Sequence, residues 1–133
     1  MDKTLFSKTG EPVAYIAEEY RQVIYLWGGS PVAYLHDEKY IYGINGRHLG
    51  WFVNSILYNH HGERIGFTSD TCPVTIAKEP TKAKKQSMDE IRPKWSAQVF
   101  PHLSFNSADQ SFAGFLKKGQ VVFNRKEIQS QQS

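Results

Sequence analysis

The sequence contains five histidines, whose side chains could bind a metal ion or act as an acid or base in catalysis. They are His36, His48, His60, His61 and His102. A structural zinc site takes about four ligands, and the adjacent pair His60-His61 has no Cys or Glu spacing nearby to complete such a set. We therefore interpret the histidines as surface residues, and we expect no metal and no cofactor.

Catalytic motifs are missing from the sequence as well. It contains no Gly-x-Ser-x-Gly elbow, no P-loop and no His-Glu-x-x-His pair. Ser104 and Ser107 lie near His102, but a catalytic triad is defined by geometry rather than by closeness in sequence. We predict that the protein is not an enzyme, and a small hydrolase or metal-dependent enzyme is the third of our functional hypotheses.

The charge of the chain is unevenly distributed. The formal net charge is +3, with six Lys/Arg against eight Asp/Glu in residues 1–72 and ten against five in residues 73–133. A basic segment at 78–95 combines cations with an aromatic residue, as a surface for single-stranded nucleic acid does. Its candidate residues are Lys82, Lys84, Lys85, Arg92, Lys94 and Trp95. Glu79, Asp89 and Glu90 interrupt it, so a solvated linker is the commoner reading and a nucleic-acid-associated accessory protein is the alternative function.

A short repeated sequence motif predicts the elements that position these residues. It reads aliphatic, aromatic, three variable residues, Gly, two variable residues, aliphatic, small, aromatic. The four copies begin at Leu5, Ile24, Ile41 and Leu57, and their anchor glycines Gly10, Gly29, Gly46 and Gly62 are 19, 17 and 16 residues apart. A fixed period this short is typical of a repeat architecture.

Each copy predicts a β-hairpin. The pairs Gly28-Gly29 and Asn45-Gly46 predict two-residue turns, whereas Thr9-Gly10 and His61-Gly62 have poorer first residues and predict either the same turn or a longer one of another type. A two-residue loop fixes the hairpin register. That register places Phe6, Tyr25, Tyr42 and Tyr58 opposite Val13, Val32, Leu49 and Ile65. One step outward, Leu5, Ile24, Ile41 and Leu57 face Ala14, Ala33, Gly50 and Gly66. Large aliphatic residues opposite small ones predict four hairpins that converge about a pseudo-four-fold axis.

Equivalent aromatic residues recur on all four hairpins. Core packing explains most of them, but rings in equivalent places could also line a groove that recognises a peptide or a protein. The candidate binding residues are Trp27, Tyr20, Arg47, Trp51, Tyr42 and Tyr58. Our leading hypothesis is therefore a non-enzymatic protein-interaction or peptide-binding module of unknown ligand, with self-association as one form of that interaction.

The second half of the chain carries no clear copy of the repeat. We divide the chain into a four-hairpin domain at 1–72 and a basic extension at 73–133 that packs on it. A short helix is predicted over Thr81–Ile91 before Pro93, and a degenerate half-repeat over Phe112–Phe123 that covers an open edge or forms an extra hairpin. Exchange of this C-terminal segment between two chains would give a homodimer.

The repeated motif resembles that of a known family, the bacterial four-fold β-flower proteins. The resemblance rests on Tyr40–Phe52 and Leu57–Phe67, with two more divergent copies before them, and covers roughly residues 5–68. It implies an all-β fold of four petal-like hairpins about a pseudo-four-fold axis and brings no activity with it. The Gly-x-x-aliphatic-Gly-aromatic phrase is also similar to WG and MORN repeats, whose periods are longer.

Composition also bears on the compartment. The single cysteine, Cys72, excludes an internal disulfide and fits a reducing environment. No apolar run approaches the roughly 18 residues of a membrane span, and no apolar signal segment follows Met1. We expect a bacterial cytoplasmic protein with no membrane partner and with an unidentified protein or peptide as its partner; nucleic acid is the less favoured ligand.

Overall fold

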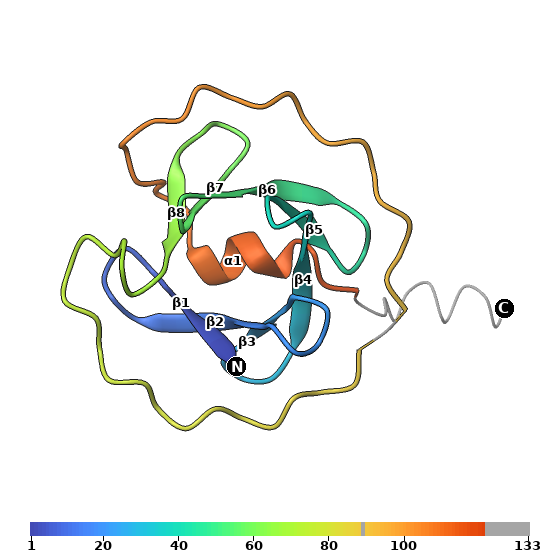
Figure 1. Ribbon diagram of the computed structural model, residues 1–133, viewed down its shortest axis with the longest axis horizontal. Helices are drawn as coiled ribbons and strands as arrows, with labels where there is room; N and C mark the ends of the chain where they lie inside the picture. The colour runs from blue at the N-terminus through green and yellow to red at the C-terminus, as the bar shows by residue number, and fades with distance from the viewer. Residues whose placement is uncertain (89, 122–133) are drawn as a thin grey trace, which may run out of the picture.

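Eight short antiparallel strands form a closed barrel in a computed structural model that describes residues 1–88 and 90–121 (Figure 1). Neighbouring strands in the chain are neighbours in the sheet, so the four predicted hairpins stand side by side around one axis. The strands are β1 (Asp2–Phe6), β2 (Pro12–Ala17), β3 (Val23–Leu26), β4 (Pro31–His36), β5 (Tyr40–Gly43), β6 (His48–Val53), β7 (Ile56–Tyr58) and β8 (Arg64–Phe67). The predicted all-β, pseudo-four-fold fold is confirmed. The ring closes through one pair, Phe6 opposite Phe67.

The hairpin register agrees with the prediction at one position and departs from it at the next. Leu5, Ile24, Ile41 and Leu57 pair with the small residues Ala14, Ala33, Gly50 and Gly66, as predicted. The register then shifts by one residue in every hairpin. Phe6, Tyr25, Tyr42 and Tyr58 therefore lie opposite Pro12, Pro31, His48 and Arg64, and the predicted partners Val13, Val32, Leu49 and Ile65 were wrong.

The loop type explains the shift. In the third hairpin Gly46 N donates to Gly43 O at 2.9 Å, and Gly43 N donates to Arg47 O at 2.8 Å. Gly46 has a φ of +92°, whereas Asn45 is not among the positive-φ residues of the described chain. The same pattern recurs at Gly10, Gly29 and Gly62. These are three-residue loops that end in a left-handed glycine and a bulge, not the predicted two-residue turns.

The tight turns lie instead between the hairpins. Each link contains two consecutive residues with left-handed backbone, Arg21-Gln22, Asp37-Glu38 and Asn54-Ser55, with φ between 51° and 64°. Paired left-handed residues match the right-handed twist of the flanking strands, which is what a short link requires. The sequence hides this feature because none of the six residues is glycine, the residue that takes up left-handed backbone most easily.

A short helix fills the lumen of the barrel. Helix α1 (Phe112–Lys117) lies inside the ring of strands in Figure 1 and buries Phe112, Phe115 and Leu116. These side chains pack with the aliphatic residues of all four hairpins in one core. The half-repeat predicted from Phe112 is therefore wrong over residues 112–117, which form a helix; Val122 and Phe123 lie outside the described residues.

The small residues of the repeats make room for this helix. A methyl group on Gly66 would lie 2.5 Å from the Phe112 ring. At Gly50 it would meet the Tyr58 carbonyl, and it would lie 3.2 Å from the Phe115 ring. The four hairpins do converge about one axis, as predicted. Helix α1 occupies the space at the centre.

Between the last strand and the helix, the chain runs around the outside of the barrel. This segment, residues 73–108 apart from residue 89, is called the belt below; Figure 1 shows it circling the sheet in yellow and orange. Its described residues at 81–88 and 90–91 are extended, so the helix predicted over Thr81–Ile91 is wrong. The belt buries outward-facing aromatic residues, and that contact replaces local helix formation.

The belt meets the four glycine turns at a regular interval. Four of its amides donate to the glycine carbonyls at 2.8–2.9 Å: Ala77 to Gly10, Gln86 to Gly29, Trp95 to Gly46 and Ser104 to Gly62. These donors are nine residues apart each time. The belt therefore follows the four-fold symmetry of the hairpins, because it contacts one glycine turn every nine residues. No repeated residue pattern in the sequence marks these contact positions.

Candidate functional site

The aromatic residues of the hairpins form a ring-lined face on the outside of the barrel, and the belt lies on it. Tyr25, Tyr42, Tyr58 and Trp51 are at most 6% exposed. Belt residues Met88, Ile91 and Leu103 pack against the two outer clusters of buried rings. The aromatic face that was predicted to recognise a peptide is therefore covered by the chain's own belt.

The six candidate binding residues fall into three groups. Tyr42, Trp51 and Tyr58 lie beneath the belt on the third and fourth hairpins, where Trp51 pairs with Tyr58 across β6 and β7. Trp27 is half-buried at the second hairpin, and its Nε1 donates to Pro80 O at 3.1 Å. Tyr20 and Arg47 are exposed on different hairpins. Their role in binding stays a prediction, and they do not form one continuous surface.

Burial shapes the electrostatics of this aromatic face. It raises the pKa of the phenols of Tyr15, Tyr25, Tyr34 and Tyr42, because a phenolate is poorly solvated beneath the belt. These hydroxyls therefore stay neutral well above physiological pH. The rings act as packing surfaces for the belt, not as charged groups.

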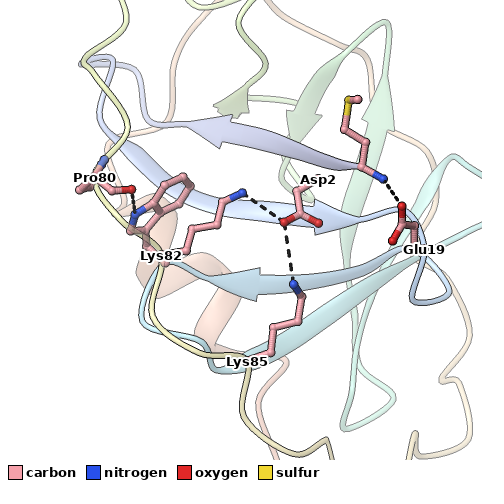
Figure 2. A network of polar contacts seen from close by, with 7 residues as sticks. Asp2, Glu19, Pro80, Lys82 and Lys85 are labelled. Atoms are coloured by element: carbon pink, nitrogen blue, oxygen red, sulfur yellow. Dashed lines mark hydrogen bonds and ion pairs between the residues drawn. The ribbon is translucent and has the colours of Figure 1, made fainter.

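Two lysines of the basic segment point toward the barrel (Figure 2). Lys82 Nζ lies 3.1 Å from Asp2 Oδ2 and 4.5 Å from the Tyr15 ring centre. Lys85 Nζ lies 3.8 Å from the same carboxylate oxygen and 5.1 Å from the same ring. These lysines attach the belt to the first hairpin, so they are engaged within the molecule. The other candidates, Lys84, Arg92, Lys94 and Trp95, are exposed.

The outer side of the belt carries a row of apolar side chains, of which the sequence analysis named only Trp95. Its members are Trp95, Val99, Phe100 and Phe105, which are 59%, 91%, 45% and 88% exposed. We call them the ring row. A cation from the barrel lies over each aromatic ring: Arg47 over Trp95 at 5.6 Å, Lys39 over Phe100 at 4.6 Å and Arg64 over Phe105 at 4.7 Å. A signal was available, since aromatic residues recur every fifth position at 95, 100 and 105 and residues 91–108 contain no Asp or Glu.

One histidine departs from the predicted surface location. His48 is only 5% exposed, because the bulge of the third hairpin turns its side chain to the aromatic face beside Tyr42. His60 and His61 are exposed on the neighbouring hairpin turn. Among the described residues, no three His, Cys, Asp or Glu side chains are grouped as metal ligands. Cys72 is half-buried, and its thiol donates to Ser7 O at 3.5 Å.

The fold defines a class of small β domain: four bulged hairpins closed into a barrel, with a helix in the lumen. A family model described as 4-fold beta flower protein matches residues 3–116, and the chain belongs to this family. The match includes the belt and most of α1, so the family extends well beyond the four hairpins. No curated protein and no solved structure matches the chain. None of the described residues forms a helix long and apolar enough to cross a membrane.

Proposed function

We propose that this chain is a protein-interaction module that binds an acidic, apolar peptide segment along the ring row. The observation that carries the proposal is the exposure of four large apolar side chains on one stretch of the belt. Large exposed apolar side chains that follow one another along a short stretch of a small protein are typical of contact surfaces.

Charge determines the chemistry of the partner. Arg47, Lys39 and Arg64 flank the row, Arg92 and Lys94 are exposed on the belt, and residues 91–108 carry no carboxylate. A partner with carboxylates beside leucine or phenylalanine would complement both features. Self-association through this row is less favoured, because a second copy would bring the same positive charges.

A fluorescein-labelled peptide of alternating Glu and Leu is a suitable probe, and binding is followed by fluorescence anisotropy on the full chain. We expect saturable binding that weakens about tenfold or more in the V99E and F105E variants. Both side chains are largely exposed, so these variants should fold. V74E is the matched control, because Val74 is an exposed belt residue outside the row. Equal affinity in all three variants, or no binding by the wild type, would overturn the proposal.

Single-stranded nucleic acid is the second candidate, and the observation that favours it is the exposed set Lys84, Arg92, Lys94 and Trp95. A labelled oligothymidylate serves as its probe in the same assay. Binding that falls steeply as salt rises, and that is weakened in K94Q, would support this alternative. Binding of the oligonucleotide without binding of the peptide would replace the protein-interaction proposal.

A further inference from the structure

A small pocket opens beside the turns of the third and fourth hairpins, near the end of α1; it shares Arg47 with the flank of the ring row but contains none of the four apolar residues of that row. Its volume is about 130 Å³, and its wall includes Arg47, His48, Asn59, His60, His61 and Lys118. The two hairpin turns supply the first five residues and the helix end supplies the sixth. Residues far apart in the sequence are thus brought to one concavity.

The charged groups of the wall all have the same sign. Arg47 and Lys118 are cations, the three histidines can become cations, and the described residues of the wall include no Asp or Glu. Within the described residues, neither Arg47 nor Lys118 takes part in an ion pair. Glu63, which follows the fourth turn and is not part of the wall, accepts a hydrogen bond from Asn59 Nδ2 at 3.1 Å. Among the residues that the structure describes, no carboxylate forms an ion pair with these two cations.

His48 adds a buried donor without a partner. Its Nδ1 lies 3.2 Å from His60 Nε2 and accepts from Gln98 N at 3.3 Å. Since a backbone N–H can only donate, the proton of the neutral ring belongs on Nε2, which is buried and has no hydrogen-bond partner. A buried donor left unpaired is costly. Because this nitrogen is buried, a bound anion would first meet Arg47, Lys118, His60 and His61.

The helix end does not oppose an anion here, because its carbonyl groups are occupied. Leu116 O accepts from Gly119 N at 3.0 Å, and Lys118 O accepts from Asn45 Nδ2 at 2.8 Å. We propose that this pocket binds a small, multiply charged oxyanion, of which inorganic phosphate is the simplest representative. Arg47 and Lys118 would supply fixed positive charge, and the imidazoles would supply directed N–H donors.

Binding should be coupled to protonation of the histidines. Burial lowers the pKa of His60, and His61, Lys118 and Arg47 lower it further, while a contact with the His48 backbone opposes them. Burial, with the neighbouring His60, also lowers the pKa of His48, to about 4. A bound anion favours the charged imidazole and raises both pKa values, so binding takes up protons and affinity should rise as the pH falls through the raised pKa of His60.

The test uses the full chain and nuclear magnetic resonance of the imidazole protons. Titration with inorganic phosphate should shift the His60 and His61 signals saturably. K118Q should weaken this binding about fivefold or more, whereas K117Q, the neighbouring exposed lysine outside the pocket wall, should leave it unchanged. Sulfate serves for the pH series, because its charge is constant in this range, and it should bind more tightly at about pH 5.5 than at about pH 7.5.

Phenyl phosphate distinguishes free phosphate from the terminal phosphate of a larger ligand. Tighter binding of the ester than of phosphate would support the site and assign it to an ester. An absence of saturable shifts with all three anions, or an equal loss of binding in K117Q and K118Q, would overturn the proposal. The ring-row variant V99E should bind phosphate normally, so the two proposals fail independently.

Discussion

At the scale of single residues, the anchor glycines have two separate reasons to be glycine. Each has left-handed backbone, and a methyl group on each would run into a belt carbonyl: that of Thr75 at Gly10, Lys84 at Gly29, Pro93 at Gly46 and His102 at Gly62. The sequence predicts the first reason, because a turn needs the left-handed residue. The second depends on a segment at least 40 residues further along the chain, so local pattern could not reveal it.

Gly28 and Gly29 are adjacent glycines with opposite expected outcomes. G29A should cost about 1–3 kcal/mol of unfolding free energy, since it combines a φ of +96° with a clash against the Lys84 carbonyl. G28A should be neutral or slightly stabilising, because Gly28 has ordinary backbone and open space around it. Urea unfolding of both variants checks this. Similar midpoints for the two would contradict the role given to the belt.

His48 shows how one shifted pair changes a residue's environment. In a two-residue turn it would lie beside the loop in solvent, which is the location that its spacing predicts. The bulge places it opposite Tyr42 and in ring contact with Trp51 at 4.7 Å. The bulge follows from the length and conformation of the loop. The sequence shows the turn glycine but not the loop length, so the burial of this histidine could not be predicted.

At the scale of elements, the small residues of the hairpins leave space in the lumen for the large side chains of the helix. The aliphatic-to-small pairing in each hairpin was predictable, because it recurs four times in the sequence. The helix that occupies the resulting space was not, since Phe112–Lys117 is only six residues long and contains Gly114, a poor helix former. Ser111 begins the helix by accepting from Gly114 N at 3.1 Å, but burial in the lumen supplies most of its stabilisation.

A double-mutant cycle tests the contact between Gly66 and Phe112. G66A alone should cost about 1–3 kcal/mol, because the new methyl group meets the Phe112 ring. In an F112L background the same change should cost less, with a coupling energy of about 0.5–2 kcal/mol from thermal or urea unfolding. G50A is the control, because its methyl group meets the Tyr58 backbone, and it should be additive with F112L. Additivity at Gly66 would refute the proposed fit of helix to barrel.

At the scale of the whole molecule, the belt and the helix complete what the four hairpins begin. The outer rings are covered by the belt, and the lumen is filled by the helix. The seam between β1 and β8 is short, so contacts from the second half of the chain add to the closure of the ring. Arg64 shows this at the fourth hairpin, since its amide donates to Asn106 O at 2.8 Å.

Hydrogen exchange should report the nine-residue spacing of the belt. The amides of Ala77, Gln86, Trp95 and Ser104 should exchange slowly, because each donates to a glycine carbonyl. The next amides at Lys78, Ser96 and Phe105 donate no hydrogen bond within the described residues and should exchange quickly. Nuclear magnetic resonance with deuterium exchange resolves them singly. Uniform exchange along residues 73–108 would contradict a belt held at four equivalent turns.

The repeated motif by itself determined the number of hairpins and the division of each into an aromatic and an aliphatic face. It also determined that the hairpins pack closely around one axis. These features depend on contacts between residues close in the chain, which a local pattern records. Tertiary structure alone decided the loop type, the extended path of the belt, the helix in the lumen and the pocket at His48. Each of these depends on surfaces that exist only once the four hairpins have closed, and a segment without its own periodicity then takes the conformation that covers them.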